Sequence, residues 1–185
     1  MMMIRPHDGG FVYGEEDLET MVQDIESAKS IGVSGVVFGC LDPSGSVAVE
    51  ACRRLLDAAG GLETTFHRAF DVGGSPIELL DQLIELGFDR VLTSGQAETA
   101  KVGREVIAQL VRHAAGRIVV LAGAGVTPDN AGSIVEGTGV SELHASASIA
   151  HPDSVNVEQT RAVQFGQSRR VTSAQRVRAI KDACG

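Results

Sequence analysis

Residues 64–71 pass from an apolar run to three ionisable side chains, and they read Thr64-Thr65-Phe66-His67-Arg68-Ala69-Phe70-Asp71. An imidazole, a guanidinium and a carboxylate therefore follow directly on a run that is typical of a buried strand. In parallel α/β sheets, ligands bind beyond the carboxyl ends of the strands. The stretch predicts a core strand whose C-terminal end carries the chemistry of the molecule.

A repeat extends this pattern along the chain. A glycine followed by a strand-like run occurs at residues 32–37, 87–92 and 139–143, and further apolar runs lie between them at 62–66 and 118–122. The spacing is roughly 27 residues, the length of one strand and one helix. With a first strand over residues 2–5, the repeat predicts six βα units.

Helical patterns separate these strands. Apolar residues with a period of 3.6 predict helices over residues 18–28, 77–84 and 102–111, a helix that opens at Thr127-Pro128-Asp129, and a last helix over 174–180. Residues 150–168 show no regular pattern, and we expect a loop there. The whole chain, residues 1–185, is expected to form a single domain.

Two architectures accommodate six βα units. No strong Gly-rich dinucleotide loop follows the first strand, which counts against a doubly wound sheet. The last two strands are followed by Gly123-Ala124-Gly125 and Ala145-Ser146-Ala147-Ser148, where (β/α)8 barrels often bind an anion. We therefore predict an α/β fold of the (β/α)8 TIM-barrel type, N-terminally truncated, whose six units correspond to strands three to eight.

Composition narrows the function. The formal charge of −8 and the absence of tryptophan argue against a nucleic-acid-binding protein. No apolar run is long enough to span a membrane, and the start lacks the layout of a secretory signal, so we expect a cytoplasmic protein without a membrane partner. One basic cluster is expected to be a solvated helix face: Arg169, Arg170, Arg176, Arg178 and Lys181.

Candidate catalytic residues lie at the ends of two strands. They are His67, Arg68, Asp71 and His144, which suit proton transfer and anion binding. Because side chains alternate along a strand, we expect only one of His67 and Arg68 to point inward. A buried ion pair between arginine and Asp71 is the structural alternative.

Candidate ligand-binding residues also follow the strands. They are Arg5, Thr93, Ser94, Gly95, Gly123, Gly125 and Ser146. A guanidinium, hydroxyl groups and accessible backbone suit a small anion. The structural alternatives are a salt bridge for Arg5, helix caps for the hydroxyls and ordinary turns for the glycines.

The strand-end motifs resemble those of the CutC copper homeostasis family over nearly the whole chain. They are Ile4-Arg5-Pro6, Gly39-Cys40-Leu41, Thr65-Phe66-His67-Arg68-Ala69-Phe70-Asp71, Arg90-Val91-Leu92-Thr93-Ser94-Gly95, Gly123-Ala124-Gly125 with Asn130, and His144-Ala145-Ser146. The resemblance implies a (β/α)8 barrel and a cytoplasmic role in copper homeostasis with copper binding. Members of the family begin with two more βα units than this sequence.

A copper ion, if bound, would use His67, His144 and Cys40 at the mouth of the barrel. Cu(I) prefers thiolates and thioethers and then imidazole, and Cys40 follows Gly39 at a strand end. Cys52 is expected on the helix outside the barrel. No Cys-x-x-Cys or Met-x-x-Met clamp is present. The alternative is an enzyme of the lyase, isomerase or aldolase type, acting on a small phosphorylated or carboxylated substrate.

An open arc of six units would expose two strand edges and the barrel interior. Three explanations are open. The true start lies upstream, which we favour; or copies associate as a homo-oligomer that covers the edges; or the chain is an inactive fragment.

Overall fold

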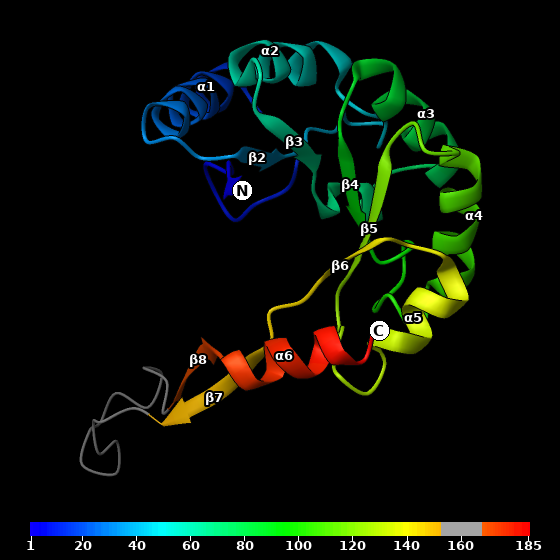
Figure 1. Ribbon diagram of the computed structural model, residues 1–185. Helices are drawn as coiled ribbons and strands as arrows, with labels where there is room; N and C mark the ends of the chain where they lie inside the picture. Colours follow the sequence, from blue (N-terminus) through cyan, green and yellow to red (C-terminus); the bar gives the residue numbers. More distant parts are fainter. Residues whose placement is uncertain (153–167) are drawn as a thin grey trace, which may run out of the picture.

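The computed structural model describes residues 1–152 and 168–185. Six parallel strands form one sheet in chain order. They are β1 (Met2–Met3), β2 (Gly35–Phe38), β3 (Glu63–Phe66), β4 (Arg90–Thr93), β5 (Val119–Gly123) and β6 (Glu142–His144). The sheet curls into a half-barrel with helices on its convex side (Figure 1), which confirms the predicted α/β architecture of six βα units.

Helices α1 (Glu15–Ser30), α3 (Pro76–Leu86) and α4 (Arg104–Ala114) occupy the predicted intervals. Helix α5 (Ala131–Thr138) begins two residues after the predicted start at 127–129, and α2 (Val49–Ala59) fills the interval between the second and third strands. Gly32, two residues beyond α1, has a φ of +76°, which glycine adopts more readily than other residues. Pro76 stands at the first position of α3, where its missing N–H is not needed.

The parallel strand pairing places the candidate site residues on one rim of the sheet. Each strand pairs with the next in parallel, as Val36 of β2 does with Thr64 of β3 and Leu121 of β5 with Glu142 of β6. The carboxyl ends of all six strands therefore lie on the same side of the sheet. At the two ends of the sheet, β1 and β6 each leave one edge unpaired within it.

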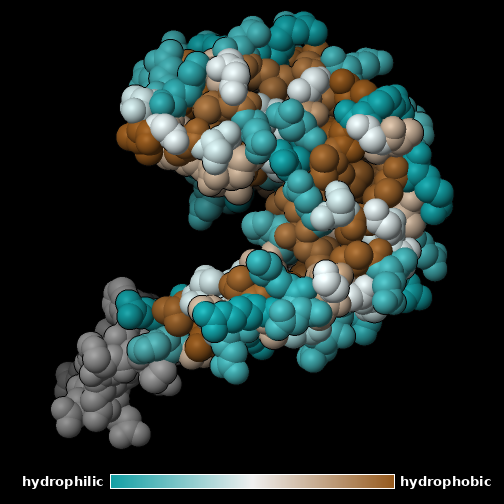
Figure 2. All heavy atoms as spheres, viewed as in Figure 1, coloured by the Kyte–Doolittle hydropathy of each residue, from teal (hydrophilic) through white to brown (hydrophobic). Residues whose placement is uncertain are grey.

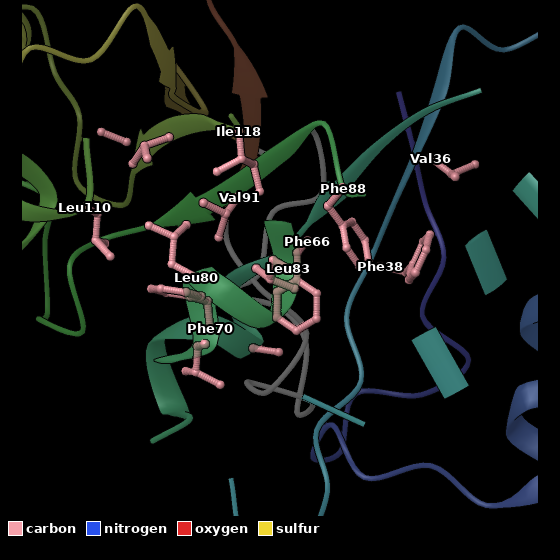
Figure 3. Close-up of a cluster of buried hydrophobic side chains, with 14 of the residues drawn as sticks. Val36, Phe38, Phe66, Phe70, Leu80, Leu83, Phe88, Val91, Leu110 and Ile118 are labelled. Atoms are coloured by element: carbon pink, nitrogen blue, oxygen red, sulfur yellow. The ribbon is translucent and has the colours of Figure 1, made fainter. Parts of the chain in front are cut away.

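The core lies between the sheet and its helices. Figure 3 shows Phe38, Phe66 and Phe88 grouped together beside Leu83 and Val91. The rings of Phe66 and Phe88 meet edge-to-face with centroids 5.5 Å apart. This packing fixes β3, the strand that leads into the ionisable stretch.

The segment after β6 differs from the predicted loop. Strands β7 (Ser148–Pro152) and β8 (Ser168–Thr172) form an antiparallel pair. The loop prediction over 150–168 is therefore wrong at both ends, and residues 153–167 lie outside the described residues. Helix α6 (Ala174–Asp182) follows and runs back to the amino end of α5 (Figure 1). A Cβ on Gly132 of α5 would lie 2.5 Å from the Ala183 carbonyl oxygen, so this contact requires glycine.

Candidate functional site: an arginine-lined cavity

A cavity of about 560 Å³ lies at the carboxyl ends of the strands. Figure 2 shows that the arc is hollowed on one side, with hydrophilic residues along its outer surface. The ionisable side chains that line the cavity are Arg5, Arg68, Arg170, Arg176, His67 and His144. Within the described part of the chain, no Asp, Glu, Lys or Cys lines it. The cavity is therefore rich in positive charge although the chain as a whole is acidic.

His67 is held rigidly at the end of β3. Its side chain packs on Gly39, where a Cβ would lie 2.7 Å from Nδ1, and its ring centroid is 4.9 Å from that of Phe11. The Ala69 backbone N–H donates a hydrogen bond to His67 Nδ1 over 3.2 Å. Because Nδ1 accepts this bond, the neutral ring carries its proton on Nε2.

The protonation state of His67 follows from its surroundings. The residue is 4% exposed, and Nε2 has no hydrogen-bond partner among the described residues. Burial lowers the pKa of His67 to about 4, and the charge of Arg5 adds to this effect. At neutral pH the imidazole is uncharged and offers a buried Nε2–H donor.

Asp71 connects the ends of β3 and β4. Its carboxylate, 5% exposed, accepts hydrogen bonds from Arg68 Nε (2.6 Å), Thr93 Oγ1 (2.6 Å), the Ser94 N–H (3.0 Å) and the Gln96 N–H (3.2 Å). The Arg68–Asp71 ion pair proposed as the structural alternative is thus present. Asp71, Thr93 and Ser94 do not line the cavity. Asp71 and Ser94 hold Arg68, whose Nη2 donates to Ser94 Oγ over 2.9 Å.

Arg5 is fixed on the loop after β1. Its Nη2 donates to the Gly9 carbonyl oxygen over 2.6 Å, and its Cζ lies 4.9 Å from the centre of the Phe11 ring. Phe11 contacts His67 as well, with the two rings tilted by 58°, so Arg5, Phe11 and His67 form one contiguous group. This arrangement keeps a cation next to the buried imidazole.

Two arginines from the C-terminal segment also line the cavity. Arg170 Nε donates to the Ser148 hydroxyl over 2.9 Å, and Arg176 Nη1 donates to the Ser148 carbonyl oxygen over 2.7 Å. The expectation of a helix face is wrong for Arg169 and Arg170, because both lie in β8, whereas Arg176 lies on α6 and is exposed as well as lining the cavity. Nothing in the local sequence indicates this position, because it depends on the pairing of β7 with β8.

The other predicted residues divide into two groups. Gly125, His144 and Ser146 line the cavity, whereas Gly95 and Gly123 do not. A Cβ on Gly95 would lie 2.4 Å from the Gly103 carbonyl oxygen, and one on Gly123 would lie 2.6 Å from Leu92 Cδ1. These two glycines allow close packing.

His67 and Arg68 both line the cavity, contrary to the expected alternation. The physical reason is local: the strand β3 ends at Phe66, and a 3₁₀ helix over Arg68–Val72 begins directly afterwards. The period-2 alternation of a strand therefore no longer applies at these two positions.

Cys40 does not join the two histidines. It is 1% exposed and absent from the cavity wall, and the Cys52 thiol lies 3.8 Å from its carbonyl oxygen. A hydrogen bond with Cys52 and burial both raise the pKa of the Cys40 thiol. The described residues contain no group of three or more His, Cys, Asp or Glu placed to hold a metal ion.

Copper binding through His67 Nε2 would cost the ring its present hydrogen bond. Metal binding through Nε2 requires the ring proton to move to Nδ1, which would break the hydrogen bond from Ala69. The softer donors on the cavity wall are limited to the Met3 thioether and the imidazoles, within the described residues.

Comparison with known proteins gives the family. The model of the CutC family matches residues 1–149. A CutC family protein of Porphyromonas gingivalis is 43% identical over 187 residues, which cover 98% of this chain and 75% of the relative. One of Histophilus somni is 51% identical over 146 residues, which cover 79% of this chain and 60% of the relative. The chain thus spans less than two thirds of the length of the second relative.

Solved structures agree with this assignment. CutC from Streptococcus agalactiae, for which a role in copper homeostasis is proposed, has a TM-score of 0.74 and 38% identity, over 77% of this chain and 70% of that one. An aldolase named QR15 shares the fold alone, with a TM-score of 0.60 and 18% identity over 76% and 65% of the two chains. None of the helices within residues 1–152 and 168–185 has the length and apolarity to cross a membrane. The chain belongs to the CutC family.

Proposed function

We propose that the cavity binds a small anion with phosphate or carboxylate groups, and that the chain acts as a (β/α)8-type enzyme on such a compound. The observation that carries this proposal is the set of four arginines on a cavity wall without a described acidic residue. Guanidinium groups bind phosphate and carboxylate with paired N–H donors. A volume of about 560 Å³ suits a small molecule.

The histidines supply the chemistry in this proposal. His67 would donate its Nε2–H to a ligand oxygen, because this buried proton has no partner among the described residues. His144, exposed at the end of β6, would exchange a proton with the bound compound. No described lysine lines the cavity, so an isomerase or lyase that works by proton transfer is favoured over an aldolase that forms a Schiff base.

Thermal unfolding with inorganic phosphate tests the proposal. Phosphate should raise the melting temperature more than chloride of equal ionic strength, because it stabilises only the folded state. Arg68→Met should abolish the shift. Arg178→Met, on α6 and outside the cavity wall, is the matched control and should retain it. Equal shifts with phosphate and chloride would contradict anion binding.

The second candidate is cytoplasmic copper homeostasis with copper as the cargo. It is supported by family membership, by the role proposed for the S. agalactiae relative, and by Met3, His67 and His144 on the cavity wall. Competition with a chromogenic Cu(I) chelator should show one equivalent bound. His67→Gln and His144→Gln should weaken binding, whereas Cys40→Ser should not. Undiminished affinity in the double histidine variant would remove the cavity as the copper site.

The cellular part of this proposal needs its own measurements. Fractionation of cells that express the chain should recover it with cytoplasmic markers. Light scattering after size exclusion would measure the predicted association of copies at the edges of β1 and β6.

A further inference from the structure

We propose that the ligand carries an anionic group at each end and bridges two separate arginine pairs. We call Arg5 and Arg68 the strand pair, and Arg170 and Arg176 the C-terminal pair. The inference rests on the proposed anion-binding function and narrows the class of ligand. It also assigns β8 and α6 to the binding site.

The strand pair is oriented before any ligand arrives. Asp71 and Ser94 hold the Nε and Nη2 of Arg68, and the Gly9 carbonyl holds the Nη2 of Arg5. A guanidinium has five N–H donors, so each arginine keeps donors for a ligand. The buried Nε2–H of His67 lies in the same part of the cavity, next to Phe11 and Arg5. Arg5 and Arg68 follow β1 and β3, two strands or about 10 Å apart, and their long side chains would hold one phosphate or carboxylate from either side of His67.

The C-terminal pair is held at a different anchor. Arg170 Nη2 and Arg176 Nη1 both donate to the Ser148 carbonyl oxygen, over 3.4 and 2.7 Å. One oxygen thus holds two guanidinium groups close together, and no acidic side chain of the described cavity wall balances them. Like charges at short range repel, and an anion between them relieves this repulsion. Ser146, whose hydroxyl lies 3.1 Å from that of Ser148, adds a further polar group.

The distance between the anchors requires an extended ligand. Arg68 follows β3 and Ser148 lies shortly after β6, three strands further along the sheet. At a spacing of about 4.8 Å between neighbouring strands, the anchors are ~14 Å apart along the curved sheet. Long arginine side chains shorten the gap across the cavity, but one phosphate is too small to contact both pairs. A short carbon chain with an anionic group at each end fits.

Calorimetric titration of the full chain with ω-phosphonocarboxylates tests this inference. The probes carry two to six carbon atoms, counting the carboxyl carbon. Methylphosphonate and acetate are the control probes with one anionic group. One chain length should bind at least about tenfold more tightly than methylphosphonate, with one molecule per chain. The optimum length then reports the distance between the two pairs.

Arginine variants test whether each pair binds one anionic end of the ligand. Arg68→Met and Arg176→Met should each reduce the affinity of the best probe to that of methylphosphonate. Arg178→Met, on the same helix but not on the cavity wall, should leave it unchanged. Circular dichroism confirms that each variant is folded.

The outcomes separate this inference from the proposed function. Equal affinity for methylphosphonate and every two-ended probe would overturn the bridging ligand and keep the anion site. An effect of Arg68→Met without an effect of Arg176→Met would remove the C-terminal pair. If none of these probes and no inorganic phosphate bound, both proposals would fail.

Discussion

Replacing Asp71 with alanine should lower the free energy of unfolding by about 3 to 5 kcal/mol. The carboxylate is 5% exposed and accepts the backbone N–H groups of Ser94 and Gln96. These amides cannot turn toward other acceptors, and each costs about 1–3 kcal/mol when buried without a partner. The Ser94 hydroxyl already donates to the Ala97 carbonyl and keeps that bond. The ion pair with Arg68, 44% exposed, contributes less than about 1 kcal/mol.

Urea unfolding followed by far-UV circular dichroism measures this effect. Arg68→Met is the comparison variant, because it removes the ion pair and leaves the amide acceptors in place. Asp71→Asn should fall between the two, since the amide keeps one oxygen acceptor. If Asp71→Ala cost no more than Arg68→Met, the backbone amides would not need this carboxylate, and its assignment as the connector of β3 and β4 would be refuted.

Three further changes probe the site and its frame. The pKa of His67 is about 4 in the folded chain and 6.5 in the unfolded chain, so the free energy of unfolding should fall by about 3 kcal/mol as the pH drops from 6.5 to 4. His67→Gln should lose this pH dependence. A constant difference in the free energy of unfolding between variant and wild type from pH 7 to 4, measured with urea, would contradict it. Gly39→Ala should lower the free energy of unfolding by about 1–3 kcal/mol and weaken phosphate binding, because the new Cβ displaces His67. Gly10→Ala is the control in both the calorimetric and the unfolding measurement, because its Cβ meets nothing within 4 Å. Arg90→Met removes the ion pair with Glu142 at the amino ends of the strands, opposite the cavity. It should lower the free energy of unfolding by about 1 kcal/mol in the same assay and leave phosphate affinity unchanged. Weakened phosphate binding would show that the amino and carboxyl ends of the sheet are coupled.

Much of the fold could be predicted because each βα unit carries its own local signals. The run into Phe66 predicts a strand buried on both faces, and the structure buries this ring completely. Pro76 and Gly32 mark a helix start and a helix end at the positions observed. Such features depend on neighbouring residues only, so the sequence is sufficient to locate them.

The site could be predicted only in part because its remaining members depend on contacts between distant segments. His67, Arg68 and His144 follow strands and were expected at the rim. Arg170 reaches the cavity only because β8 pairs with β7, and no periodicity indicates that pairing. Cys40 follows a strand as well, yet the chain buries it against Cys52. Strand-end position alone does not distinguish a cavity-lining side chain from a packed one.

The four cavity arginines also set up a charge separation across the molecule. The formal charge of −8 includes them, so the outer surface is more acidic than this figure indicates. An anion in solution is repelled by that exterior and attracted only through the hollow side of the arc, where low-dielectric walls focus the field. Added salt screens both the repulsion and the attraction, because it shortens the Debye length. If the proposed anion binds, the acidic exterior would direct its approach to the hollow side, and the arginines would retain it there.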